Sequence, residues 1–269
     1  MAEFRKMRGL VYKDFDRKTH VLPASKLPDM DSFTYGFGID FGFTNPFCAQ
    51  WWALDPDGRM YMYRELYGTQ TLVEDWAHEI HTLSQKEKIM AYICDHDAED
   101  RATLERHLAH DENHCTLGME KGFANRKILR KSTLAANKTK LPKDGIQDVK
   151  SRLREAGDGK PRLFLFRDAL AMDPDPQLVS ESKPTCTEEE IEGYVWDRIE
   201  KGRFGERTTE NPRKINDHGM DALRYAVIFA DKPVKSFDAS VWGKAMKHGY
   251  GTKREATSIS AGAGWYLDP

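Results

Sequence analysis

The apolar positions in the first part of the chain predict three consecutive antiparallel strands. Residues 35–41, 47–54 and 59–67 are short stretches rich in aromatic side chains, and polar or glycine-containing segments separate them. The segment between the second and third stretches, Asp55-Pro56-Asp57-Gly58, has the residue types of a tight hairpin turn. We therefore expect a sheet that begins with strands connected one after another along the chain.

Farther along the chain, helical spacing alternates with short apolar runs. Leu72, Trp76 and Ile80 recur at helical intervals, whereas Ile89–Cys94 has the length and flanks of a buried strand. The expected elements are, in order, a helix over 72–83, a strand over 89–94, a helix over 99–107, a strand over 115–119, a helix over 145–156, a strand over 162–166, a helix from residue 187 and a last helix over 217–230. Strands followed by alternating helices and strands favour a mixed α/β sandwich around one sheet.

Polar patterns mark the expected helix starts. Thr71-x-x-Glu74 and Thr187-x-x-Glu190 both match a capping box, in which the two side chains satisfy each other's backbone N–H groups. Asn216 is the expected N-cap of the last helix. Residues 202–212 show no periodic pattern, so we expect an irregular, basic connector there.

The composition indicates one folded domain. The chain has 269 residues, of which 39% are hydrophobic, and no apolar run approaches the roughly 18 residues of a membrane span. We expect a lead-in segment over 1–33, one α/β domain over 34–231 and a polar tail over 232–269. The first residues lack the apolar core of a signal peptide and the four cysteines are scattered, so a reduced cytosolic setting is expected.

Charge is distributed unevenly, although the formal net charge is only −2. Residues 121–167 hold fourteen Lys and Arg against four Asp and Glu, whereas residues 168–200 hold ten acidic and two basic residues. A solvated basic face is the ordinary explanation of such a block. The size of the local excess favours instead a surface that contacts a phosphate backbone.

Carboxylates occur at three places where partial burial makes them costly. Asp40 lies in the first expected strand, and Asp95 directly follows the apolar run of the fourth. Asp217 and Asp221 are four residues apart, so they share one face of the last helix, and His218 is adjacent. A divalent cation is the natural compensation for such carboxylates, and a pair of Mg²⁺ or Mn²⁺ ions is what metal-assisted phosphodiester hydrolysis uses.

Each of these carboxylates also has a purely structural explanation. Asp40 could cap the turn that follows it, and Asp217 could stabilise the N-terminus of the last helix. Asp95 and Asp97 could begin the next helix. Their joint placement on the first strand, a central strand and the last helix nevertheless favours the catalytic interpretation.

Three stretches resemble the acidic motifs of a known nuclease family. YGFGIDFGFTNP, YICDHDAEDRATLERH and KINDHGMDALRYAV occur in an order and spacing similar to the nuclease domain of bacteriophage terminase large subunits, the DNA-packaging motors of tailed phages. The resemblance covers most of the chain, residues 9–230. It implies an RNase H-like fold of the resolvase and integrase type, with a mixed central sheet flanked by helices, and cleavage of double-stranded DNA with two divalent ions.

The resemblance assigns roles to individual residues. It implies that the catalytic metal ligands are Asp40, Asp95 and Asp221, and that neighbours able to join the site are Asp217, His218 and Asp97. The choice between Asp95 and Asp97 as the ligand of the second motif stays open. The implied activity is two-metal-ion hydrolysis of concatemeric viral DNA during genome packaging, with Mg²⁺ or Mn²⁺ as the cofactor.

The expected partners follow from the same resemblance. They are double-stranded DNA, a packaging ATPase domain, the small terminase subunit and the portal, in the host bacterial cytoplasm at the procapsid portal. The residues expected to contact DNA are Lys127, Arg130, Lys131, Lys138, Lys140, Arg203, Arg207, Arg213 and Lys214. No G-x-x-x-x-G-K-[ST] phosphate loop occurs in the sequence, so the chain resembles the nuclease portion alone and is not expected to hydrolyse ATP.

Two other function classes fit parts of the sequence. Residues 40–45, DFGFTN, also resemble the first phosphate loop of actin-like and sugar-kinase ATPases, but a second phosphate loop and an adenosine-binding glycine pair are not found. A non-catalytic DNA-binding module gives no reason to place carboxylates, which repel phosphate, on three separate elements. Both classes remain alternatives to the nuclease.

Overall fold

The computed structural model describes residues 9–26, 28, 33–84, 87, 89–94, 97–109, 142–202 and 205–231. The elements in chain order are α1 (Arg17–His20), β1 (Val21–Leu22), the 3-10 helix η1 (Ala24–Lys26), β2 (Thr34–Asp40), β3 (Phe47–Leu54), β4 (Met60–Gly68), α2 (Val73–Ser84), β5 (Ile89–Cys94), α3 (Ala98–Ala109), α5 (Pro142–Leu153), β6 (Leu163–Phe166), α6 (Pro176–Ser180), α7 (Thr187–Gly193), β7 (Trp196–Gly202), β8 (Gly205–Pro212) and α8 (His218–Asp231). The expected strand 115–119 and the expected tail lie outside the described residues. In the described ranges, no helix is both long enough and apolar enough to cross a membrane.

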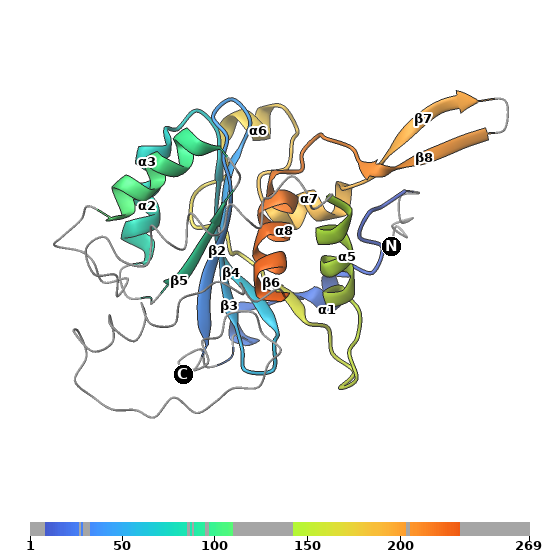
Figure 1. Cartoon of the computed structure of the whole chain (residues 1–269), viewed down its shortest axis with the longest axis horizontal. Coiled ribbons are helices and arrows are strands. Elements are labelled where there is room, and N and C mark those ends of the chain that lie inside the picture. Colours follow the sequence, from blue (N-terminus) through green and yellow to red (C-terminus); the bar gives the residue numbers. More distant parts are fainter. Residues whose placement is uncertain are drawn as a thin grey trace.

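A six-stranded mixed sheet runs through the centre of the fold (Figure 1). Its strand order is β1-β6-β4-β3-β2-β5. The strands β2, β3 and β4 pair antiparallel, as the sequence predicts, and Asp40 at the end of β2 lies opposite Cys48. Parallel pairs join β5 to β2 and β6 to β4. Parallel neighbours need crossover connections, and these carry the helices over the faces of the sheet.

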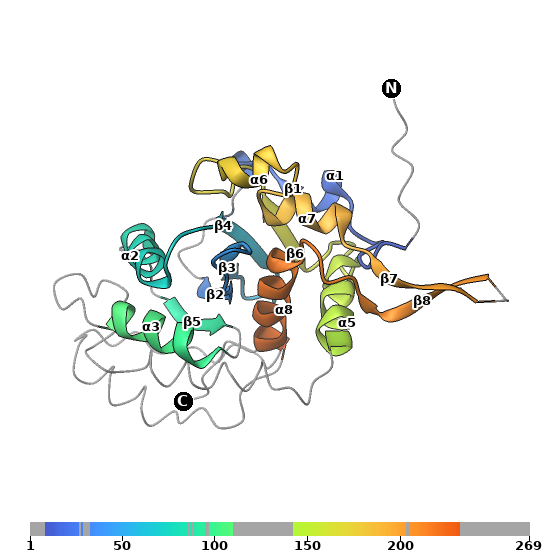
Figure 2. The same cartoon turned by 90° about the horizontal axis from the view of Figure 1, so that it is seen from above.

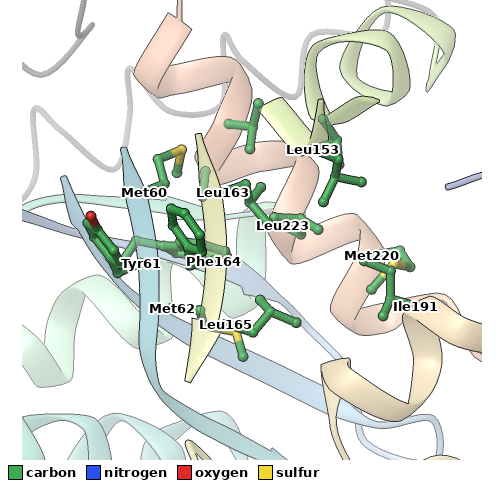
Figure 3. Close-up of a cluster of buried hydrophobic side chains, with 14 of the residues drawn as sticks. Met60, Tyr61, Met62, Leu153, Leu163, Phe164, Leu165, Ile191, Met220 and Leu223 are labelled. Carbon is green, nitrogen blue, oxygen red and sulfur yellow. The ribbon is translucent and has the colours of Figure 1, made fainter. Parts of the chain in front are cut away.

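Helices cover the two faces of the sheet separately (Figure 2). On one face α2 and α3 pack against β2, where Phe37 and Ile39 share an apolar cluster with Trp76, Ile80 and Leu104. On the other face lie α5 and α8. The cluster there includes Met60, Met62, Leu163 and Leu165 from the strands and Leu153, Ile191, Met220 and Leu223 from the helices (Figure 3).

The side-chain alternation of β2 decides which of its residues face α8. Because successive side chains of a strand point to opposite faces, Gly38 and Asp40 lie on the face opposite to that of Phe37 and Ile39. At Gly38 an added Cβ atom would lie 2.2 Å from the carbonyl oxygen of Ala222. Glycine therefore permits α8 to approach the backbone of β2 directly, two residues before Asp40.

Two segments differ from the sequence-based expectation. Within the expected irregular connector over 202–212, residue 202 ends β7 and residues 205–212 form β8, and the two strands pair antiparallel and project from the body in Figure 1. Both strands are dominated by charged and polar residues, so no apolar alternation marks them in the sequence. Residues 176–180, where no helix is expected, form α6, and the N–H groups of Gln177 and Leu178 donate to the Asp175 carboxylate.

The N-terminal segment contributes to the same core. The short strand β1 pairs parallel with β6 at one edge of the sheet. Val11, Tyr12 and Phe15 are buried in the cluster that contains the α5 and α8 side chains. The segment expected as a lead-in to the domain thus packs against it.

Candidate active site

Asp40 lies at the end of β2, on the face that α8 covers, and its residue exposure is 8%. His218 is the first residue of α8, and its Nδ1 is 3.0 Å from Asp40 Oδ2. Burial disfavours the charged imidazole, but the hydrogen bond and the charge of Asp40 outweigh burial, so the pKa of His218 is raised. Strand β2 and helix α8 are thereby joined by an imidazole–carboxylate pair.

Asp217 and Asp221 lie one helical turn apart and share a cation. The Nζ atom of Lys214 is 2.9 Å from Asp217 Oδ2 and 3.0 Å from Asp221 Oδ2. Both aspartates are buried, whereas 61% of the Lys214 side chain is exposed. Two carboxylate oxygens from buried residues therefore converge on one cation position. The Lys214 ammonium occupies this position, and it belongs to a side chain that is largely exposed to solvent.

A second cation holds Asp221 from the interior. Arg224, one turn farther along α8, is buried and donates from Nη2 to Asp221 Oδ1. Burial by itself would raise the pKa of Asp221, but Arg224 and Lys214 outweigh burial and the pKa is lowered. Burial opposes the charge of Lys214, yet Asp221 and Asp217 prevail and raise its pKa. Asp221 is thus kept ionised, as a metal ligand must be.

The carboxylates present fit a divalent cation. Asp217 Oδ2 is buried, accepts no hydrogen bond from a backbone N–H of the described residues and pairs with the Lys214 ammonium. Carboxylate oxygens are the donors that Mg²⁺ and Mn²⁺ favour. In the part of the chain that the structure describes, no three His, Cys, Asp or Glu side chains are grouped around one point. Asp95, the expected ligand from the second motif, lies outside that part.

Asp97 has a structural role at the start of α3. Its Oδ1 accepts hydrogen bonds from the N–H groups of Glu99 at 2.9 Å and Asp100 at 3.0 Å. This is the geometry of an N-cap, which satisfies backbone donors that have no partner within the helix. The capping contacts favour Asp95 over Asp97 as the ligand from the second motif.

Two buried glutamates lie behind the carboxylates, and the sequence reasoning missed both as site residues. Glu65 of β4 and Glu190 of α7 are each 1% exposed. Burial raises the pKa of Glu65 to about 7 and that of Glu190 to about 8, against the hydrogen bonds that both accept. An acidic residue inside an aromatic strand was the available signal for Glu65. Glu190 was hidden by its match to a capping box.

Neither expected capping box forms. The Thr71 hydroxyl donates to the carbonyl of Thr69, and α7 begins without a side-chain cap. Thr187 instead donates from its N–H and its hydroxyl to Glu65. Gln50 of β3 donates to Thr187 Oγ1 at 2.6 Å and to the carbonyl of Gly219 at 2.8 Å. These contacts form one buried polar network that ties β3, β4 and α7 to the start of α8.

Few of the basic residues expected to contact DNA fall in the described ranges. Arg213 and Lys214 are exposed and lie directly before α8, and Arg207 is on β8. The following residues lie outside the described residues: Lys127, Arg130, Lys131, Lys138, Lys140 and Arg203. Among the basic residues expected to contact DNA, Lys214 is thus placed directly against the carboxylates.

Comparison with known proteins gives likenesses in structure. No family model and no curated protein sequence matches the chain. The large terminase of a thermophilic bacteriophage matches at 23% identity with a TM-score of 0.51, over 81% of this chain and 44% of that one. The same terminase in complex with ATP-γ-S matches at 22% identity with a TM-score of 0.52, over 81% and 45%. The nuclease domain of the phage P22 large terminase matches at 18% identity and a TM-score of 0.44, over 82% and 92%.

The chain spans less than half of the length of the thermophilic phage's terminase. Its central mixed sheet, flanked by helices on both faces, confirms the α/β fold class predicted from the sequence. At the level of the fold, an RNase H-like mixed sheet flanked by helices, the chain resembles the bacteriophage large terminases, as its three acidic motifs predict.

Proposed function

We propose that the chain is a divalent-metal-dependent endonuclease that cuts double-stranded DNA, the nuclease part of a phage DNA-packaging terminase. One observation carries the proposal. Asp40 on β2 meets His218 at the start of α8, where Asp217 and Asp221 converge on a cation position. These residues come from the first and last of the three acidic motifs, and the fold around them is shared with a large terminase.

The ligands of the metal would be Asp40, Asp217 and Asp221, together with Asp95. Bound Mg²⁺ or Mn²⁺, as a pair of ions, would supply an activated water and stabilisation of the leaving oxygen. The protein's own part is to keep the carboxylates ionised and in place. Arg224 does this for Asp221, and His218 holds Asp40 by a hydrogen bond.

Contacts to the DNA would come mainly from phosphate-binding side chains. Arg213 and Lys214 precede α8, and the Lys214 ammonium pairs with two of the carboxylates. Both side chains would contact the backbone of the strand that is cut. The basic block of residues 121–167 would add contacts to the duplex. Phosphate contacts carry no sequence information, so the nuclease would cut with little base preference.

The setting of the reaction is proposed from the family resemblance. The substrate would be concatemeric viral DNA, and the partners would be a packaging ATPase domain, the small terminase subunit and the portal. The reaction would take place in the host bacterial cytoplasm, at the procapsid portal.

Nicking of supercoiled plasmid tests the proposal. The protein is incubated with plasmid and Mn²⁺ or Mg²⁺, with and without chelator, and relaxed and linear products are measured on a gel. The expected result is cleavage that needs the ion. Asp40→Asn keeps the shape of the side chain and removes a charge, and we expect it to slow cleavage by roughly a hundredfold or more.

The matched control is Asp173→Asn, on an exposed loop. It should cut at the rate of the original protein. Equal nicking by Asp40→Asn, or cleavage that persists in chelator, would contradict the proposed function.

A further inference from the structure

The first turn of α8 has backbone donors that need partners from outside the helix. The helix begins at His218, and the N–H of Asp221 donates to the carbonyl of Asp217 at 2.8 Å. Asp217 therefore occupies the N-cap position. The first N–H groups of any α-helix lack partners within it, and an aspartate at this position ordinarily accepts hydrogen bonds from them with its own side chain.

In this protein a distant glutamate accepts those hydrogen bonds. Oε1 of Glu190 accepts from the N–H of His218 at 3.2 Å. Oε2 of Glu190 accepts from the N–H of Gly219 at 2.6 Å and from the N–H of Met220 at 3.2 Å. Glu190 lies on α7, a different helix, and its Oε1 also accepts a hydrogen bond from the Tyr67 hydroxyl of β4.

Glycine at position 219 makes this arrangement possible. A Cβ atom added there would lie 2.7 Å from Glu190 Oε2 and 2.3 Å from Thr187 Oγ1. Any side chain at that position would thus push α7 away from the start of α8. The carboxylate of Glu190 reaches three consecutive N–H groups only because the backbone at Gly219 is bare.

The carboxylate of Asp217 is left without a capping role. Its Oδ2 is buried, accepts no hydrogen bond from a backbone N–H of the described residues and pairs with the Lys214 ammonium at 2.9 Å, next to Asp221. Glu190 therefore accepts the hydrogen bonds that an N-cap residue ordinarily accepts from the first turn of its helix. The Asp217 carboxylate faces the cation position instead.

We propose that Glu190 is a positioning residue: by capping α8 in place of Asp217, it releases the Asp217 carboxylate to bind the divalent cation together with Asp221. The identity of the cation rests on the proposed function. The capping relation does not, since it depends only on hydrogen bonds within the protein.

The proposal predicts what happens when Glu190 is removed. An N-cap aspartate needs only a change of side-chain rotamer to accept from the N–H groups of the first turn. In Glu190→Ala, Asp217 should therefore turn back and cap its own helix. The helix would persist, but the cation position would lose one of its two carboxylates.

A double-mutant cycle tests the capping half of the proposal. The unfolding equilibrium is measured by denaturant titration for the full chain, Asp217→Ala, Glu190→Ala and the double variant. In the original chain Asp217→Ala should leave the unfolding constant within about twofold, because Glu190 holds the cap. In the Glu190→Ala background the same change should raise it roughly fivefold, because it then removes the cap. Equal effects of Asp217→Ala in both backgrounds would overturn the proposal.

Mn²⁺ binding, measured by calorimetry without DNA, tests the other half. Asp217→Ala and Glu190→Ala should each weaken binding, and the double variant should bind no more weakly than the weaker of the two. Glu190→Gln has the same shape and keeps one acceptor oxygen, which can still accept from the N–H groups of Gly219 and Met220. It should therefore bind Mn²⁺ more tightly than Glu190→Ala, and it also serves if Glu190→Ala does not fold. Glu192→Ala, at an exposed position on the same helix, is the control and should change neither the Mn²⁺ affinity nor the effect of Asp217→Ala on the unfolding constant. The proposal would be overturned if the original chain binds Mn²⁺ and a folded Glu190→Ala variant binds it with the same affinity.

The two halves separate this inference from the proposed function. If the original chain neither binds Mn²⁺ nor cuts plasmid, the proposed nuclease function is contradicted. The stability cycle would still decide whether Glu190 or Asp217 caps α8, and an absence of coupling there would overturn the positioning role whatever the activity.

Discussion

Gly38 of β2 and Ala222 of α8 approach so closely that a methyl group on Gly38 would lie 2.2 Å from the Ala222 carbonyl oxygen. Asp40 lies two residues farther along β2, and His218 lies one turn earlier on α8, on the same side of each element. The hydrogen bond between their side chains, at 3.0 Å, is thus set by a backbone contact about one helical turn away. The distance between β2 and α8 therefore decides whether His218 can reach Asp40.

Gly38→Ala should disturb both stability and cleavage. The methyl group meets backbone rather than a flexible side chain, so α8 must shift, at a cost of roughly 1–3 kcal/mol in the free energy of unfolding. The shift also separates His218 from Asp40, and we expect plasmid nicking to fall with it. Denaturant titration and the nicking assay measure the two effects.

Gly157→Ala is the matched control for that change. No atom outside its neighbours lies within 4 Å of a Cβ added at Gly157. The free energy of unfolding should stay within about 0.5 kcal/mol of the original value. A Gly38→Ala protein as stable and active as this control would show that α8 does not need its close contact with β2.

Asp97→Ala and Asp95→Ala should have opposite consequences. Asp97 caps α3, so its removal should lower the free energy of unfolding by about 1 kcal/mol and leave most of the nicking activity. Asp95, the proposed ligand, should be needed for cleavage. Unfolding curves and nicking rates of both variants decide the matter, and activity lost only in Asp97→Ala would reverse the two roles.

Lys214→Met should strengthen metal binding and weaken DNA binding. The Lys214 ammonium lies between Asp217 and Asp221, where it would compete with the proposed divalent ion, and its exposed side chain would be able to contact phosphate. We expect Mn²⁺ affinity to rise several-fold and the salt dependence of DNA binding to flatten by about one unit of slope. Calorimetry and salt-dependent binding isotherms measure the two quantities.

Lys183→Met, at an exposed position paired with Glu181, serves as the control for loss of one positive charge. It should leave Mn²⁺ affinity unchanged. If Lys214→Met binds Mn²⁺ less tightly than this control, the lysine supports the cation site instead of competing for it.

Glu65→Gln should change how stability depends on pH. Burial raises the pKa of Glu65 from 4.5 to about 7. Between these two values the folded chain holds a proton that the unfolded chain releases, so this contribution to stability is complete below the lower pKa and is lost as pH rises through the higher one. Relative to Glu65→Gln, which cannot titrate, the original chain should lose roughly 3 kcal/mol between pH 4 and pH 8.

Denaturant titration of both proteins between pH 4 and pH 8 measures the difference in their free energies of unfolding. Glu190 is present in both proteins, so its own titration contributes to both. A difference in stability that does not change with pH would mean that Glu65 keeps its ordinary pKa in the folded chain.

Local patterns were sufficient to predict most of the described elements. Each of these elements depends on residues that are neighbours in the sequence, so its pattern can be recognised without knowledge of the tertiary structure. They are the aromatic stretches of β2, β3 and β4, the turn at Asp55-Pro56-Asp57-Gly58 and the apolar run of β5. The acidic motifs around Asp40 and Asp221 could be found in the same way. The β7–β8 hairpin could not, because its strands lack a repeating apolar face.

The partners of buried polar groups were decided by the tertiary structure. Thr187-x-x-Glu190 has the residues of a capping box, yet Thr187 contacts Glu65 and Glu190 caps a different helix. A sequence pattern states only which hydrogen bonds are geometrically available within one turn. Once β4, α7 and α8 pack together, the buried donors and acceptors must be satisfied across the interface, because leaving them unpaired away from water costs more than breaking a local motif. The sequence by itself determined most of the strands and helices and the positions of the acidic residues, and packing determined which of those residues face the site.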